Sequence, residues 1–145
     1  MNARKRKKLQ NRLMTAVIWG TSSQVAKLLR GGADPNRPDR DGSTPLYRAS
    51  VHGNAGIVRV LLAGGARPDV ESGSGDEGLP LCAAAVWGHD DTVRELLAAG
   101  ADPRLREDNG TGPTAAEWAR RADRHTTYEL LSAAGTTDQA HRDRS

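Results

Sequence analysis

The sequence has 145 residues and a formal net charge of +3, contains no Phe, and holds a single cysteine, Cys82. This length suits one domain with a modest core, and one cysteine excludes both an intramolecular disulfide and a thiolate metal cage. We expect a cytoplasmic protein without a membrane span, because reducing compartments keep thiols free and no apolar run approaches the roughly 18 residues that a span requires.

The first ten residues form a basic segment. Its charge comes from Arg4, Lys5, Arg6, Lys7 and Lys8, whereas acidic residues outnumber basic ones in the chain after residue 12. We expect residues 1–10 to be a mobile tail, which can remain solvated, attract nucleic acid or an anionic surface, or act as a nuclear address. Since the segment carries no aromatic residue for base stacking, a nucleic-acid-associated adaptor is the alternative function rather than the favoured one.

From residue 11 onward the chain repeats itself. One glycine recurs at spacings of 33, 35 and 35 residues, as Gly32, Gly65, Gly100 and Gly135. A leucine always stands four positions before this glycine and an alanine sixteen positions before it. Self-similarity at this period is typical of solenoids. The alignment predicts four units, at about residues 11–38, 39–73, 74–108 and 109–135, followed by a polar tail over 136–145.

The second unit shows the expected structure of a repeat. Thr44 and Pro45 suit the N-cap and the first turn of a helix that ends near Gly53. A second helix carries its apolar residues on one stripe and ends at Gly65. The pattern predicts two helices in each unit, about eight in all, and no extensive sheet. We expect high burial for the paired leucines of the second helices, which are Leu28, Leu29, Leu61, Leu62, Leu96 and Leu97.

The segment DGSTPLYRASVHGNAGIVRVLLAGGARPD (41–69) closely resembles the ankyrin-repeat family, as does LPLCAAAVWGHDDTVRELLAAGADP (79–103). The resemblance covers about residues 11–135. It implies an all-α solenoid of helix-turn-helix repeats with hairpin-like loops, which binds a partner protein as a monomer. Tyr47 and Cys82 replace the family's usual histidine, and Leu79 replaces its capping threonine, so one hydrogen bond should be missing from the third unit. The excess of Arg over Lys, with abundant Ala and Gly, indicates a high-GC bacterial gene.

The resemblance also implies a contact surface on the inner face of the stack and its loops. The candidates at the ends of the first helices are Ile18, Trp19, Val51, His52, Val86, Trp87 and Arg121. Those on the loops, which should form a mixed and mostly acidic rim, are Arg40, Asp41, Ser43, Asp76, Glu77, Arg106, Glu107 and Asp108. Tryptophan is enriched at binding hot spots, although it can also simply cover neighbouring helices. We expect Trp19, His52 and Trp87 to lie partly exposed along one groove.

The sequence contains no strong motif for catalysis or for binding a metal or cofactor. The four histidines lack the spacings of a metal site, and no glycine-rich loop ends in the lysine of a phosphate-binding motif. An enzyme using Cys82 would need a nearby base and an electropositive setting, whereas the flanking Leu81 and Ala83 predict burial. We therefore expect a non-enzymatic protein without cofactor or metal.

Overall fold

The computed structural model describes the backbone of residues 1–143 and the side chains of residues 1–136. Within residues 1–143 the chain forms nine helices and no β-strand, apart from an isolated bridge between Arg106 and Thr114. The helices are α1 (Ala3–Trp19), α2 (Ser22–Arg30), α3 (Pro45–His52), α4 (Ala55–Ala63), α5 (Pro80–Trp87), α6 (Asp90–Ala98), α7 (Glu107–Gly110), α8 (Ala115–Arg121) and α9 (His125–Asp143).

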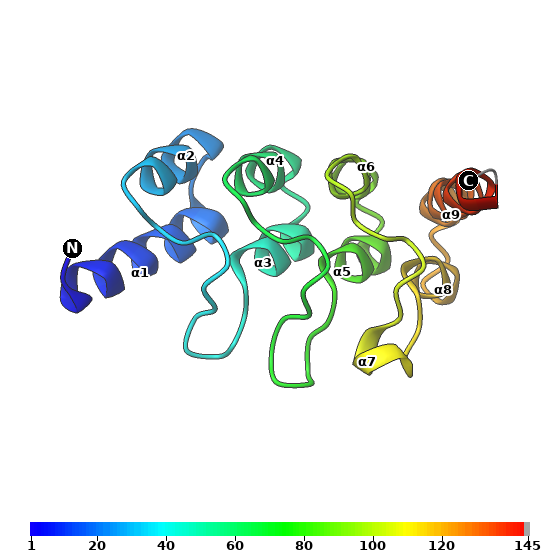
Figure 1. Ribbon diagram of the computed structural model, residues 1–145, viewed down its shortest axis with the longest axis horizontal. Coiled ribbons are helices and arrows are strands. Elements are labelled where there is room, and N and C mark those ends of the chain that lie inside the picture. The colour runs from blue at the N-terminus through cyan, green and yellow to red at the C-terminus, as the bar shows by residue number, and fades with distance from the viewer. Residues whose placement is uncertain (144–145) are drawn as a thin grey trace.

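The helices form four pairs stacked side by side (Figure 1). Helices α1, α3, α5 and α8 make one layer, each packed on the next, and α2, α4, α6 and α9 make the other. Long loops project beyond the first layer before α3, α5 and α8. The predicted all-α solenoid of helix-turn-helix repeats is therefore confirmed. The helix that belongs to none of the four pairs, α7, is a single turn within the third of these loops.

Side-chain caps fix where most of these helices begin. Thr21, Thr44, Asn54 and Thr114 each accept a hydrogen bond from the backbone N–H three residues later, which satisfies a donor that has no partner inside the helix. Leu79 offers no such bond at the start of α5, as the sequence predicted. The third unit must satisfy that helix start in another way.

The core is a layer of aliphatic side chains between the two rows of helices. Leu28, Leu61 and Leu96 are buried, as expected. The expectation was wrong for the second leucine of each pair, since Leu29, Leu62 and Leu97 are only half-buried against the core. Adjacent residues of a helix point about 100° apart, so both members of a pair cannot face the same core. Leu29 instead lies against Gly64, between the outer helices of neighbouring units.

Both expected tails belong to helices. Helix α1 begins at Ala3, capped by Asn2, so the basic segment forms its first turns rather than a separate tail over 1–10. Gln10 fixes this extension, because its side chain donates to the Asp34 carbonyl at 2.7 Å and accepts from the Asp34 N–H at 3.0 Å. At the other end α9 continues to Asp143, so most of the predicted tail over 136–145 is also helical.

Candidate partner-binding face

Three side chains at equal positions of the repeat form a row across the stack. Trp19, His52 and Trp87 are the last residues of α1, α3 and α5, which pack on one another in sequence. The side chain of Trp19 is 83% exposed, that of Trp87 is 55% exposed, and His52 is also exposed. We call these residues the Trp–His–Trp row. Their exposure agrees with the expectation from sequence.

The backbone around the row is held by bonds between units. Gly53 and Gly88, which end α3 and α5, have φ of 71°, a left-handed conformation that glycine adopts without strain. The carbonyl of Val51 lies 3.0 Å from His89 Nε2, and the carbonyl of Val86 accepts from Arg124 Nε at 3.0 Å. The ends of α3 and α5 are thus tied to the following unit.

The other predicted residues at the helix ends contribute less surface. Ile18, Val51 and Val86 are half-buried beside the row. Arg121, the last residue of α8, is exposed, and its guanidinium lies 5.5 Å from the centre of the Trp118 ring. A cation over an aromatic face is attracted by the ring's negative face. The fourth unit therefore presents a positive charge near the position where the first and third present tryptophan.

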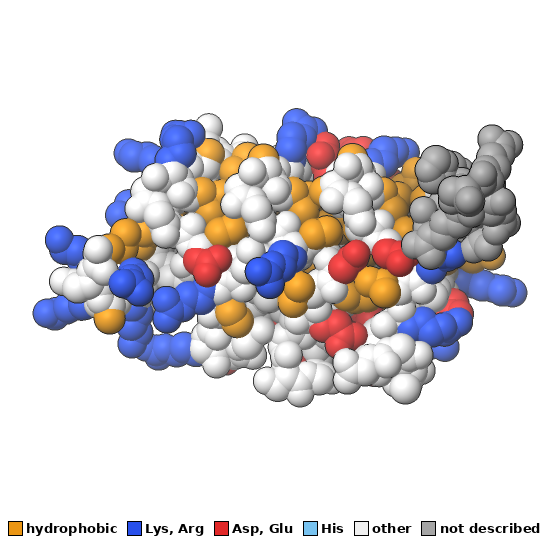
Figure 2. Space-filling view, in the orientation of Figure 1, with side chains coloured by type: hydrophobic (Ala, Val, Ile, Leu, Met, Phe, Trp, Pro, Cys, Tyr) orange, Lys and Arg blue, Asp and Glu red, His pale blue; other side chains and the backbone are white. Residues whose placement is uncertain are grey.

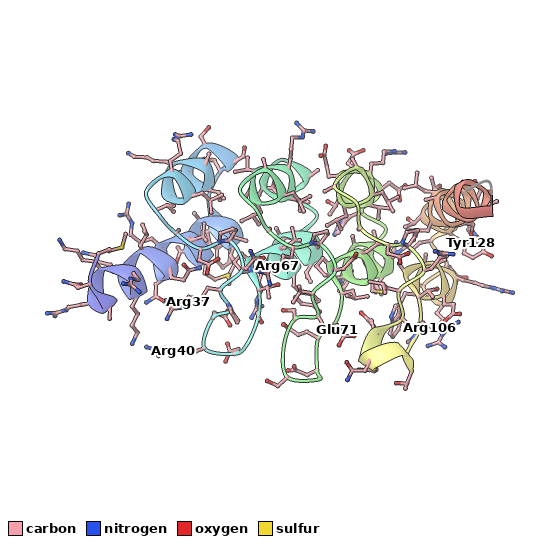
Figure 3. All side chains as sticks on the ribbon, viewed as in Figure 1. Arg37, Arg40, Arg67, Glu71, Arg106 and Tyr128 are labelled. Atoms are coloured by element: carbon pink, nitrogen blue, oxygen red, sulfur yellow. The ribbon has the colours of Figure 1, made fainter. Side chains whose placement is uncertain are left out.

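Five of the predicted loop residues reach solvent. Arg40, Asp41, Asp76 and Asp108 are exposed, and Arg40 and Arg106 extend from two different loops in Figure 3. Arg106 is exposed but engaged, because it donates to Glu117 Oε1 at 3.0 Å and to the Gly112 carbonyl at 3.1 Å. The hydrogen bond from Arg106 is the main reason that the pKa of Glu117 is lowered.

The expectation that Ser43 and Glu77 form part of the exposed rim was wrong for the serine and only partly right for the glutamate. Ser43 is 1% exposed, and its hydroxyl donates to Glu77 Oε2 at 2.8 Å. The other oxygen of the half-buried Glu77 accepts from the Ser72 hydroxyl at 2.7 Å. These residues join the bases of two loops, so their polar groups are already occupied.

Glu107 was also wrongly expected on the rim. It is 9% exposed and accepts from the Leu79 N–H at 2.9 Å and from Trp118 Nε1 at 2.8 Å. Its carboxylate lies so close to Gly78 that a Cβ there would collide with it. Glu107 therefore satisfies the start of α5, which Leu79 leaves without a side-chain cap.

The second unit uses the same arrangement. Ser72 Oγ accepts from the Thr44 N–H at 2.9 Å, and Ser72 and Glu107 both stand 28 residues after the N–H that they bind. The sequence reasoning missed these two loop acceptors. The signal that could have found them is the common 28-residue spacing of a polar residue from each helix start.

Cys82 is a core residue. Its side chain is 1% exposed, and burial raises the pKa of the Cys82 thiol, with the nearby Glu107 carboxylate adding to the effect. The neutral thiol that results is a poor nucleophile. Burial likewise raises the pKa of Tyr47, which occupies the same position in the second unit. Cys82 belongs to the core, whereas Tyr47 is half-buried.

Residues 1–143 contain no helix that is both long and apolar enough to cross a membrane. Among the side chains of residues 1–136, no three His, Cys, Asp or Glu gather in a way that could hold a metal ion.

The sequence is similar to a known repeat family and to several known proteins. The family model "Ankyrin repeats (3 copies)" matches residues 13–107. The chain is 48% identical over 48 residues to the ADP-ribosylation factor GTPase-activating protein AGD2 of Arabidopsis thaliana, covering 33% of this chain and 6% of that protein. It is 44% identical over 61 residues to human SH3 and multiple ankyrin repeat domains protein 1, covering 41% and 3%.

A third relative is the mouse ankyrin repeat and SOCS box protein 16, which is 43% identical over 49 residues, covering 34% of this chain and 11% of that protein. All three relatives are much longer proteins, of which the matched part is a small fraction. The likeness therefore extends to the repeats and not to the whole relatives. With two thirds of its length matched by the family model and four stacked helix pairs, the chain belongs to the ankyrin-repeat family.

Proposed function

We propose that the chain binds a partner protein through the Trp–His–Trp row and the exposed loop tips beside it. Ankyrin repeats are generally protein–protein interaction modules, and the family is typically non-enzymatic. The observation that supports this particular face is the exposure of Trp19 and Trp87, 83% and 55%, at equal positions of two units. Large aromatic surface is unfavourable in water, and a partner that covers it gains the free energy of its burial.

The row suits binding because it is already ordered. The bonds from His89 and Arg124 hold the backbone at the ends of α3 and α5, below His52 and Trp87, so association requires little further ordering there. Asp41, Asp76 and Asp108 add exposed negative charge on the loops that precede the first helices, interrupted by Arg40. A charged rim of this kind selects among partners and speeds their association more than it adds affinity.

We also infer a cytoplasmic protein without catalytic activity. The argument for the compartment is the free thiol of Cys82, which suits a reducing environment. The argument against catalysis is that this thiol is buried and protonated, so it lacks the exposed, electropositive setting of a reactive cysteine.

The experiment introduces a photo-crosslinking residue at Trp87, identifies the captured protein, and then measures its affinity for purified variants. Trp87→Ala should weaken binding by about 2 kcal/mol or more, roughly thirtyfold, while the free energy of unfolding changes little. Tyr128→Ala is the matched control, because Tyr128 is a partly exposed aromatic residue on α9, outside the row. If Trp87→Ala lowers stability and leaves the affinity unchanged, the tryptophan only covers its neighbours and the proposal is wrong.

A further inference from the structure

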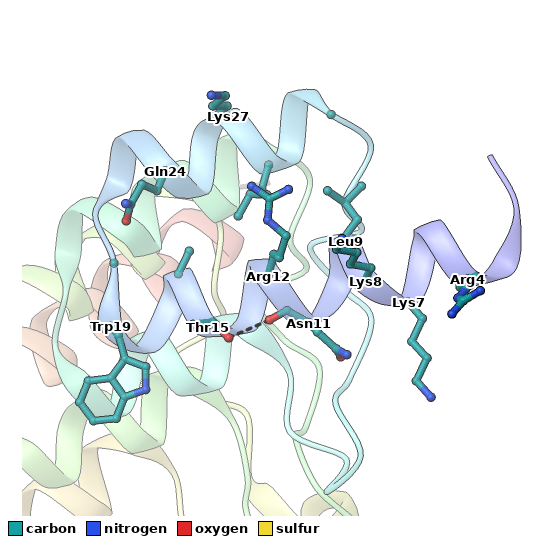
Figure 4. A pocket seen from close by; sticks show the side chains of 14 residues that line it. Arg4, Lys7, Lys8, Leu9, Asn11, Arg12, Thr15, Trp19, Gln24 and Lys27 are labelled. Atoms are coloured by element: carbon teal, nitrogen blue, oxygen red, sulfur yellow. Dashed lines mark hydrogen bonds between the residues drawn. The ribbon is translucent and has the colours of Figure 1, made fainter.

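A second surface lies at the N-terminal end of the stack, between α1 and α2. It is an open groove of about 980 Å³. Leu9, Ala16 and Leu28 form its apolar floor, and Figure 4 shows Leu9 and Arg12 between the two helices. Trp19 marks one end of the groove. Binding through the Trp–His–Trp row would use only Trp19 of this groove, so the rest of the groove can serve a separate function.

The groove occupies the place where a preceding repeat would pack. By the 33-residue spacing, Gln24 and Lys27 of α2 and Gly31, its C-cap, correspond to Ile57, Val60 and Gly64 in the second unit. There, Gly64 is pressed against Leu29 of the first unit, and Ile57 is only 1% exposed. The same face of α2 is open. In the second unit the corresponding face of α4 packs against a helix, so the open face of α2 has a shape that suits a helix.

The charge of the groove is one-sided. Five of its lining residues are basic and none is acidic: Arg4, Lys7, Lys8, Arg12 and Lys27. The extension of α1 to Ala3, which α3 and α5 lack, supplies three of these cations. Figure 2 shows basic side chains crowded around this end of the molecule. Solubility of an end repeat requires polar residues but not charge of a single sign.

We propose that this groove binds an acidic amphipathic helix of a partner protein. The apolar stripe of such a helix would cover Leu9, Ala16 and Leu28, and its carboxylates would face the surrounding Lys and Arg side chains. Long basic side chains suit this arrangement because their aliphatic stems extend the apolar floor while their charges remain in water. This surface adjoins the proposed partner-binding face, with which it shares only Trp19.

Two other occupants fit less well. A nucleic acid would use the cations but would leave the leucine floor without a counterpart, since its backbone is polar throughout. A second copy of this chain would stack its opposite end here, and that end carries Arg120, Arg124 and His125 around a small pocket with one acidic residue, Asp123. Positive charge would then meet positive charge.

The test measures fluorescence anisotropy of a labelled synthetic peptide of about 18 residues, the length of helix that spans α1. It carries leucine at i, i+3, i+4 and i+7 and glutamate elsewhere. Two probes of matched charge are a scrambled peptide of the same composition and a single-stranded oligonucleotide. We expect the amphipathic peptide to bind at least tenfold more tightly than the scrambled one. Equal binding of all three probes, or no binding of the amphipathic peptide, would overturn the proposal.

Charge-reversal variants locate the site. Arg12→Glu with Lys27→Glu should weaken binding of the peptide at least tenfold. The pair Arg30→Glu and Arg67→Glu, which changes the net charge equally at exposed positions outside the groove, should weaken it less than threefold. Equal losses in the two pairs would mean that only overall charge matters and would overturn the proposal.

Two measurements keep the result independent of folding and of the proposed partner-binding face. Circular dichroism verifies that each variant is folded, and backbone amide shifts of the unmodified protein map the bound peptide without any substitution. Shifts confined to α1 and α2 support the groove, and shifts centred on α3 and α5 refute it. Trp87→Ala should leave peptide affinity unchanged, so the two proposals fail separately.

Discussion

Glu107→Ala tests most directly how the third and fourth units are joined. The Glu107 carboxylate, 9% exposed, accepts one bond from the Leu79 N–H and one from Trp118 Nε1. A hydrogen bond to a charged group contributes about 1.5–3 kcal/mol, and a buried donor without an acceptor costs about 1–3 kcal/mol. Since water can enter part of the vacated space, we expect the free energy of unfolding to fall by about 3 kcal/mol. Glu107→Gln keeps one acceptor oxygen and should lose about half as much.

The measurement is urea unfolding followed by circular dichroism. Glu129→Ala, which removes an exposed glutamate of α9, is the matched control and should stay within about 0.5 kcal/mol of the unmodified protein. Gly78→Ala should also destabilise, because its Cβ displaces the carboxylate, and its effect should shrink once Glu107 is already alanine. If Glu107→Ala loses no more stability than Glu129→Ala, the carboxylate does not join the units.

The remaining predictions concern the core, the first helix and pH. Leu61→Ala should cost about 2–5 kcal/mol in urea unfolding and Leu62→Ala clearly less, because only Leu61 is fully buried; equal losses would contradict this assignment. Gln10→Ala should cost about 1 kcal/mol and speed amide exchange at Asp34, and unchanged exchange would show that the α1 extension is not held there. Burial raises the pKa of the Cys82 thiol in the folded protein above its value of about 8.5 in the unfolded chain. The contribution of Cys82 to stability is therefore complete below about pH 8.5. Above that pH the free energy of unfolding declines, by up to about 1.4 kcal/mol per pH unit. Cys82→Ala should flatten unfolding free energy against pH between about 8.5 and 10, and identical slopes would refute that reasoning.

The repeat architecture was predictable because each helix start and stop is a local signal. Thr44 and Pro45 favour a helix start through their local chemistry alone, without distant contacts. The 33-residue period then indicates which helix faces of neighbouring units meet. The position of the Trp–His–Trp row followed from the same register.

The buried acceptors were not predictable in this way. Glu107 looks like any surface glutamate in the sequence, and its burial depends on a partner 28 residues earlier. The helical start at Ala3 was missed because the basic segment lacks the apolar stripe on which helix prediction depends, and its docking rests on one glutamine, Gln10. Both cases involve long-range contacts that periodicity alone does not reveal.

The acceptors at Ser72 and Glu107 tie the starts of α3 and α5 each to the loop that leads into the next first helix. The start of α3 is completed by a residue that precedes α5, and the start of α5 by one that precedes α8. In a nearest-neighbour description, the start of each of these helices therefore depends on the connection that leads to the next unit being in place. Loss of the last unit would remove Trp118, so the Glu107 carboxylate that satisfies the Leu79 N–H in the third unit would lose one of its two donors. A new unit inserted into the middle of the array would need its own polar acceptor, placed 28 residues after the start of its first helix.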